Sequence, residues 1–155
     1  YAFTKSLNDK DKFLSELRHG EEMIDQLDDV HPISEVSLKQ IESINGAEIA
    51  FARRENMKHL WGLLYGRVKM IPGLERSFNG APFSLPILVE NRDAIQKQLA
   101  QKGVYAPVLW SANEQARKVC KVSAYVADQM LAIPIDQRYN YDDIEDIAKI
   151  VLETV

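Results

Sequence analysis

Apolar and polar positions in the second half of the chain predict alternating strands and helices. Residues 83–89 form an apolar run with the length of a buried strand, and Asn91 directly after it is a good N-cap for a helix. Ile95 and Leu99 then fall on one face of that helix, spaced i and i+4. Residues 104–110 are a second apolar run, rich in β-forming side chains. The pattern therefore predicts a strand, a helix and a second strand in this part of the chain.

Two further apolar runs flank this unit. Residues 67–71 predict a short edge strand, and residues 131–135 predict a strand near the C-terminus. Pro86 removes a ladder donor from the first strand of the unit, so we expect that strand at an edge of the sheet or bulged. After the C-terminal strand, Asn140 or Asp142 caps a last helix.

Residues 111–130 predict one helix whose apolar side is turned inward. A free thiol packs well in such a position, because cysteine behaves as a small hydrophobe. We therefore expect the following side chains on the buried face of this helix: Val119, Cys120, Val122, Tyr125, Val126 and Met130.

The first half of the chain is helical in character. Residues 9–28 carry an apolar stripe, which we expect Gly20 to divide into two helices, because glycine costs up to about 1 kcal/mol inside a helix. Ser34 or Ser37 then caps a short helix, and a long helix follows over residues 47–64. The two halves of the chain therefore differ in the kind of structure that they predict.

Together these elements predict an α+β fold. A helical N-terminal part is followed by a small, mainly antiparallel sheet of three or four strands, with helices packed on one face. We expect residues 1–66 to form a helical linker region and residues 67–155 to form an α/β small domain, the whole being one compact unit. A chain of 155 residues is long enough to bury one sizeable core.

Composition and charge argue against some function classes. The net charge is −4, and basic residues do not alternate with aromatic ones along a strand, which argues against nucleic acid as a partner. No apolar run approaches the roughly 20 residues that span a bilayer, and the first residues do not resemble a secretory leader. Cys120 has no second cysteine for a disulfide, which suits a reducing compartment. We expect a cytoplasmic chain without a nucleic-acid or membrane partner.

Motifs that would carry catalysis are absent from the sequence. The three histidines, His19, His31 and His59, are far apart, and none has a cysteine or histidine at metal-ligand spacing. The sequence contains neither a glycine-rich phosphate loop nor a nucleophile elbow. Cys120 could form a nucleophilic dyad with a histidine, but its apolar neighbours favour a packing role. The residues alone therefore predict no metal site and no catalytic residue.

Several segments nevertheless resemble one enzyme family, in their order along the chain. They are Ile33 to Ser37, Arg53-Arg54-Glu55-Asn56, Pro82 to Val89 with Asn91-Arg92-Asp93, Lys102 to Trp110, and Leu131 to Tyr139. Taken together they are similar to the C-terminal small domain of the DegT/DnrJ/StrS family of pyridoxal-phosphate-dependent aminotransferases, which have fold type I and mostly act on nucleotide sugars. The match spans about residues 31–155.

This resemblance implies that the chain is the C-terminal part of an enzyme that transfers an amino group to a sugar or a related carbonyl substrate. In that family the catalytic lysine and most contacts to pyridoxal 5'-phosphate lie in a large N-terminal domain, and Lys69 and Lys102 match no motif for such a lysine. We therefore expect no catalytic residue and no bound cofactor on this chain alone. We expect as partners the missing N-terminal domain and, in the parent enzyme, a second copy.

The resemblance also implies that this domain covers one side of an active-site cleft and helps to enclose the substrate. Tyr105, Trp110 and Arg138 are the candidate substrate-binding residues, because they lie at strand ends or in a loop beside one. The alternative is that the two aromatic side chains pack in the core and that Arg138 is a surface ion-pair partner. Leu109 stands where many sugar-modifying members have a histidine, which argues against a sugar nucleotide as the substrate.

A second function class stays open, that of a freestanding α+β ligand-binding or regulatory module. The chain begins Tyr-Ala-Phe-Thr without a methionine, so we expect a piece of a longer protein, with a processed or tag-cleaved start as the alternative. A large α/β domain encoded before Tyr1 would favour the aminotransferase, and a start codon close before Tyr1 would favour the module.

Overall fold

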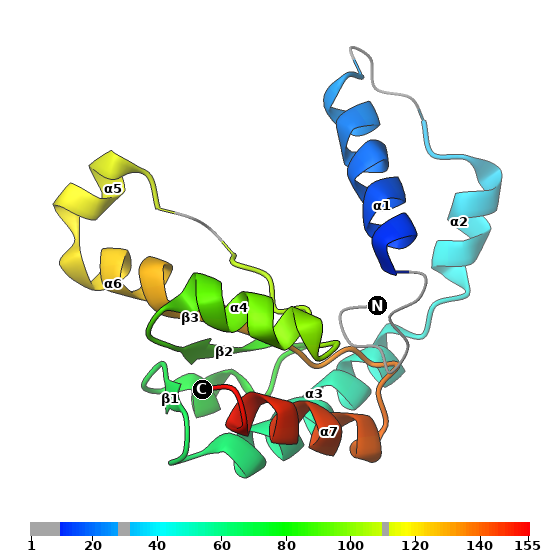
Figure 1. Ribbon diagram of the computed structural model, residues 1–155. Coiled ribbons are helices and arrows are strands. Elements are labelled where there is room, and N and C mark those ends of the chain that lie inside the picture. The colour runs from blue at the N-terminus through cyan, green and yellow to red at the C-terminus, as the bar shows by residue number, and fades with distance from the viewer. Residues whose placement is uncertain (1–9, 28–31, 110–111) are drawn as a thin grey trace. The chain divides into compact units, whose positions relative to one another are not determined.

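The chain forms two compact units. The computed structural model describes residues 10–27, 32–109 and 112–155 (Figure 1). Unit 1 contains the described residues from Ala47 onward, and unit 2 contains those up to Gly46. The sequence placed a division after residue 66, whereas the helix that precedes this point packs into the core of unit 1.

Unit 2 is made of two helices, α1 (Lys10–Asp25) and α2 (Glu35–Glu42). The expected break of the first helix at Gly20 is wrong, because α1 runs through it without interruption. A single exposed glycine weakens a helix by about 1 kcal/mol, which is too little to end one flanked by good helix formers. Ser34 caps α2 as predicted, since its hydroxyl accepts from the backbone N–H of Ser37 at 3.1 Å.

Unit 1 is built on a three-stranded antiparallel sheet. Its strands are β1 (Lys69–Met70), β2 (Ser84–Leu88) and β3 (Met130–Pro134), in the order β1-β2-β3. The α+β fold with a helical N-terminal part is therefore confirmed, and β1 is the edge strand that the sequence predicted.

The expectation that Pro86 marks an edge or bulged strand is wrong, because β2 is the central strand. Val89 donates its N–H to Gln129 O at 2.9 Å, so hydrogen-bonded pairs alternate from there along the β2–β3 ladder. Pro86 faces Ala132 in a pair without hydrogen bonds, and its nitrogen points to the side of β1. β1 has already ended at that position, so the missing donor costs no ladder bond.

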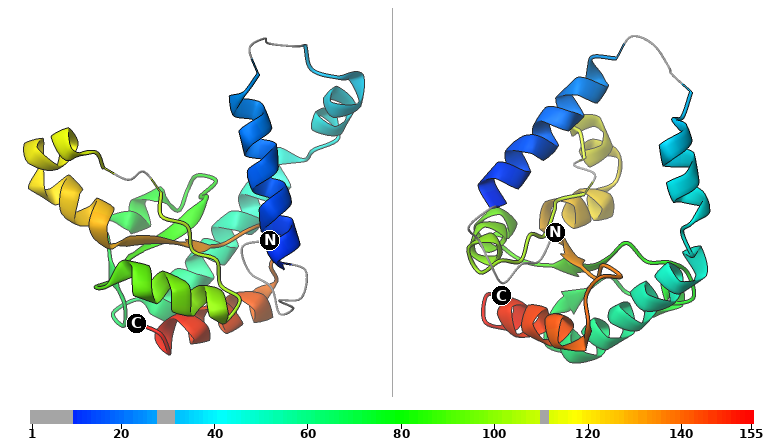
Figure 2. Two further views of the ribbon diagram at one scale, coloured as in Figure 1. Left: turned by 45° about the horizontal axis from the view of Figure 1, so that its top comes forward. Right: turned by 90° about the vertical axis from the view of Figure 1, so that its right-hand side faces the viewer.

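Three long helices supply the rest of the core: α3 (Gly46–Leu64), α4 (Arg92–Gln101) and α7 (Tyr141–Leu152). Their buried side chains join the alternate strand residues Leu85, Ile87, Leu131 and Ile133 in one cluster. Figures 1 and 2 show α3 and α7 along the same face of the sheet. Cluster members from the helices include Met57, Leu60, Leu64, Leu99, Ile144, Ile147 and Val151.

The N-cap predicted for α7 forms, whereas the one predicted for α4 does not make a cap bond. Asn140 caps α7 as one of the two predicted candidates, in a capping box with Asp143. Asn91 stands at the predicted N-cap of α4, but it adopts a left-handed conformation with φ 52° and its side chain makes no cap bond. A short 3-10 helix, η1 (Leu74–Ser77), connects β1 with the turn before β2.

The strand predicted over residues 104–110 is wrong for its described part. Only Val104 forms an isolated bridge, and residues 105–109 follow without regular pairing. Ala132 N–H donates to Pro107 O at 3.1 Å, so this segment does follow the outer side of β3. Pro107 has no N–H to return, which prevents a continuous ladder.

The single helix predicted over residues 111–130 is also wrong. It is divided into α5 (Glu114–Val119) and α6 (Lys121–Gln129), with Cys120 extended between them at φ −137° and ψ 106°. This break changes the direction of the apolar stripe, so that Val119 is 87% exposed and Val122 is 72% exposed. Cys120 is exposed as well, and Tyr125 lies at the surface.

Candidate functional site

A polar loop between β3 and α7 is held by the side chains of α3. Arg53 and Asn56 lie three residues apart and therefore on the same side of that helix. Asn56 donates from Nδ2 to the carbonyl oxygens of Asp136 and Tyr139, at 2.8 and 3.2 Å. Arg53 donates from Nε to Gln137 Oε1 at 2.8 Å. We call residues 136–139 the α7 entry loop, and these bonds fix its path over α3.

Asp136 lies between two arginines in this loop. Arg138 donates from Nε and Nη2 to its two carboxylate oxygens at 2.6 and 2.9 Å, and its own backbone N–H adds a third bond at 2.9 Å. Arg53 Nη2 lies 3.9 Å from Asp136 Oδ2. The bonds from Arg138 hold the pKa of the Asp136 carboxyl below its usual range, against a smaller opposing effect of burial. Two cations thus share one carboxylate, which leaves the group with a net positive charge.

The side chains that meet at the α7 entry loop differ in how far they are exposed. The side chain of Asn56 is buried, with 6% of the residue exposed, whereas those of Arg53 and Asp136 keep about a fifth of their surface. The side chain of Arg138 is 52% exposed. The inner part of the group therefore fixes the loop, and the outermost guanidinium faces solvent.

Phe83 extends the group toward β2. Its side chain is exposed, and the guanidinium carbon of Arg53 lies 5.8 Å from the centre of its ring. This distance is within the range of a cation–π contact. An aromatic surface therefore lies beside Arg53, and an anionic ligand with an apolar part would find both a cation and an aromatic ring there.

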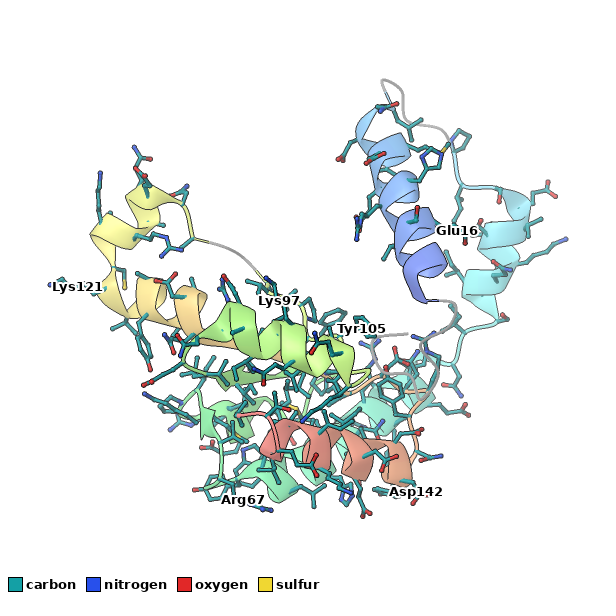
Figure 3. The ribbon with its side chains drawn as sticks, viewed as in Figure 1. Glu16, Arg67, Lys97, Tyr105, Lys121 and Asp142 are labelled. Atoms are coloured by element: carbon teal, nitrogen blue, oxygen red, sulfur yellow. The ribbon has the colours of Figure 1, made fainter. Side chains whose placement is uncertain are left out.

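The structure treats the three predicted site residues differently. Arg138 lies in the α7 entry loop and forms the ion pair that the alternative interpretation assigned to it, while remaining half-exposed. Tyr105 is partly buried just beyond the end of α4 (Figure 3). Trp110 lies outside the described residues.

The sequence did not identify Arg53, Asn56 and Asp136 as parts of one group. The signal was present, because the motifs Arg53-Arg54-Glu55-Asn56 and Asp136-Gln137-Arg138-Tyr139 both belong to segments that resemble the family. Their contact joins residues 80 to 84 positions apart, and no periodicity reports on such a contact.

Neither lysine considered for a Schiff base fits that role. Lys69 donates to the Tyr125 hydroxyl at 2.7 Å, and this hydrogen bond raises the pKa of its exposed ammonium group. Lys102 donates to Thr154 Oγ1 at 3.0 Å, with the Glu153 carboxylate 4.0 Å away. A lysine that attacks a carbonyl needs a lowered pKa and a free amine. As they are placed here, Lys69 and Lys102 therefore do not fit the role of the lysine that binds the aldehyde of pyridoxal phosphate.

Metal binding finds no support in the part of the chain that the structure describes, where no three histidine, cysteine or acidic side chains gather as a possible ligand set. His59 lies against Tyr141, with ring centres 4.9 Å apart, and its Nε2 is 3.4 Å from the Glu145 carboxylate. Through these contacts His59 packs against α7.

No family model, curated protein or solved structure matches the chain. Within the described ranges, no helix combines the length and the apolar character that crossing a membrane requires.

Proposed function

We propose that the chain is the C-terminal, substrate-covering part of a pyridoxal-phosphate-dependent aminotransferase-like enzyme. In this proposal it acts on a sugar or a related carbonyl substrate, together with a preceding domain that supplies the catalytic lysine. The parent enzyme is a cytoplasmic homodimer, and this chain alone is inactive.

One observation carries the proposal. Three of the segments that resemble the DegT/DnrJ/StrS family meet at a single side chain, Arg53. It donates to Gln137, lies 3.9 Å from Asp136 and approaches the ring of Phe83. Their contact at one side chain makes a single surface out of three segments that each resemble the family, which supports the interpretation that they belong to one site.

The residues of the group would divide the work between them. Asn56 fixes the backbone of the α7 entry loop from inside, because its amide donates to two backbone carbonyls there, in one buried and one partly buried bond. Asp136 orients Arg138 through a bidentate pair, which restricts the guanidinium to one geometry. Arg138 then offers its exposed side to an anionic group of the substrate, such as a carboxylate or a phosphate. Closing this surface over a cleft would also exclude water.

The surface of unit 2 supports the idea of a preceding domain. All of its described side chains are exposed except that of Ser37, and large apolar ones are among them. Amphipathic helices of this kind need another surface to cover them. In the proposal the missing domain covers them and holds pyridoxal phosphate, since Lys69 and Lys102 are both engaged elsewhere.

The second candidate is a freestanding ligand-binding or regulatory module. It is favoured by the continuous core of unit 1, which joins buried side chains from α3 to α7 in one cluster. In this case Arg138 and its neighbours would bind an anionic ligand without any chemistry.

The reading frame upstream of Tyr1 in the source gene separates the two candidates. A large α/β domain with a lysine on a loop after a strand is the expected result, and amino transfer by the full-length protein would then be assayed. A start codon close before Tyr1 would overturn the aminotransferase proposal. As a second test, the chain is mixed with pyridoxal phosphate and reduced with borohydride. Stoichiometric labelling of one lysine would contradict the claim that the catalytic lysine lies elsewhere.

A further inference from the structure

A second surface of unit 1, distant along the chain from the α7 entry loop, has the features of a peptide-binding groove. The groove opens where α3 ends and the chain turns into β1, a turn marked by Arg67 in Figure 3. Gly66 and Gly73, with φ of 73° and 78°, form the bends on either side of the strand. The volume of the groove is about 490 Å³, and the residues lining it include Trp61, Tyr65, Val68, Met70, Pro72 and Glu75.

Two aromatic side chains form the wall of this groove. Trp61 and Tyr65 are one helical turn apart, and their ring centres are 4.3 Å apart with an angle of 35° between the planes. Phe78 also packs against Trp61, edge to face, with ring centres 5.4 Å apart. Tyr65 is 64% exposed, although tyrosine gains most by burying its ring. The wall is therefore fixed in position and still open to a ligand.

The polar groups along the groove are unused in the part of the chain that the structure describes. Neither the indole N–H of Trp61 nor the hydroxyl of Tyr65 has a hydrogen-bond partner among the described residues. The carboxylate of Glu75 is exposed and forms no ion pair with any described residue. Two unused donors and one negative charge without an ion-pair partner among the described residues therefore belong to side chains that line the groove.

We propose that this groove binds a proline-rich segment in the polyproline II conformation that carries an arginine or lysine. A polyproline II chain has no internal hydrogen bonds, so its carbonyl groups are free to accept from Trp61 and Tyr65. Its proline rings pack on aromatic walls, and its stiffness lowers the entropy lost on binding. The basic residue pairs with Glu75. The same carboxylate disfavours a phosphate-bearing partner.

The probe is a ten-residue peptide in which prolines alternate with leucine and one arginine stands at the end. Binding is followed by NMR through the indole N–H signals of the two tryptophans, and Trp110→Phe assigns the signal of Trp61. We expect a shift of the Trp61 signal that saturates with a Kd below about 1 mM. A peptide in which glycine and serine replace the prolines but the arginine remains should bind at least about tenfold more weakly.

Three substitutions test the assignment. Tyr65→Ala should weaken binding by about tenfold, because an aromatic anchor is lost, while Tyr141→Ala, another exposed tyrosine in unit 1, should leave it unchanged. Trp61→Phe retains an aromatic ring but lacks the N–H that serves as the NMR probe, so its binding is followed through the backbone amide signals of the groove residues. It should weaken binding by about fivefold. Glu75→Gln should weaken binding of the arginine peptide by about threefold. Binding of a peptide with glutamine in place of that arginine should stay unchanged.

Each contrary result overturns the proposal in a recognisable way. Absence of any shift at 1 mM peptide, or equal binding of the glycine–serine peptide, would exclude polyproline recognition. Equal weakening by Tyr65→Ala and Tyr141→Ala would place the peptide elsewhere. Circular dichroism of each variant separates a loss of binding from a loss of fold.

Discussion

Units 1 and 2 have similar amphipathic helices but treat their apolar side chains in opposite ways. In unit 1 the apolar faces of α3, α4 and α7 meet the sheet, and most of their core side chains are fully buried. In unit 2 the apolar side chains of α1 and α2 are exposed wherever the structure describes them, among them Leu17, Ile24, Val36 and Ile41. The same sequence periodicity therefore predicts a helix in both units, but within the described residues of each unit only the helices of unit 1 bury their apolar faces against other elements of that unit.

Truncating one isoleucine in each unit tests this contrast most directly. Ile147→Ala in α7 removes a fully buried side chain, and we expect a loss of about 2–5 kcal/mol in the free energy of unfolding, because a cavity remains. Ile41→Ala in α2 makes the same change at an exposed position and should cost less than about 0.5 kcal/mol. Urea denaturation followed by circular dichroism measures both. Similar losses in the two variants would contradict the contrast.

A smaller effect is expected from the amide that ties α3 to the α7 entry loop. Asn56→Ala removes the amide that donates to the carbonyls of Asp136 and Tyr139 in this largely buried position, which should cost about 1–3 kcal/mol in the same assay. Gln98→Ala, at an exposed position of α4, provides the matched control and should be nearly neutral. If Asn56→Ala behaved like Gln98→Ala, the loop would not depend on α3.

The pH dependence of unfolding tests the ion pair at Asp136. Because its pKa is lowered in the folded chain, the carboxylate contributes stability above its unfolded pKa of about 3.9, and this contribution is lost as the pH falls through the folded value. Between pH 6 and pH 3 the free energy of unfolding of the parent chain should fall by about 1 kcal/mol more than that of Asp136→Asn. The difference is modest because solvent reaches the ion pair.

Arg138→Gln serves as the partner experiment, since it keeps the carboxyl and removes its main hydrogen-bond donor. It should show a pH dependence between those of the parent chain and Asp136→Asn. A variant indistinguishable from the parent would show that Arg138 does not set the pKa of Asp136.

The smallest effect is expected in unit 2. A Cβ at Gly20 would meet no atom within 4 Å, so Gly20→Ala should stabilise α1 by about 0.5–1 kcal/mol through helix propensity alone. Hydrogen exchange should report slower opening of α1. The global unfolding of unit 1 should stay unchanged, and a shift there of the same size would show that the two units unfold together.

Sequence patterns predicted those parts of the fold that local chemistry decides. The sheet strands β1, β2 and β3, the caps Ser34 and Asn140, and the long helix α3 follow from apolar runs and capping residues. Predictions failed where a distant partner decides the outcome. Pro86 is tolerated in a central strand only because β1 ends before it. The sequence around Pro86 carries no information about the length of that neighbouring strand.

The candidate site was predictable only as separate pieces. Arg138 could be chosen from its place after a strand, but the contacts of Asp136 and Asn56 depend on how α3 crosses the C-terminal loop. The prediction that Val119 and Val122 lie on a buried helix face is wrong for a related reason. One extended residue, Cys120, breaks the helical period on which that prediction rested.

The central position of β2 has a consequence for the order of folding during synthesis. Its pairing with β1 closes within about 20 residues of chain, whereas its pairing with β3 must wait until a segment more than 40 residues later has been made. The bonds from Asn56 to the α7 entry loop span 80 and 83 residues and close later still. Until β3 has been made, one edge of β2 stays open. A ribosome that pauses between β2 and β3 would therefore present an unpaired strand to other nascent chains.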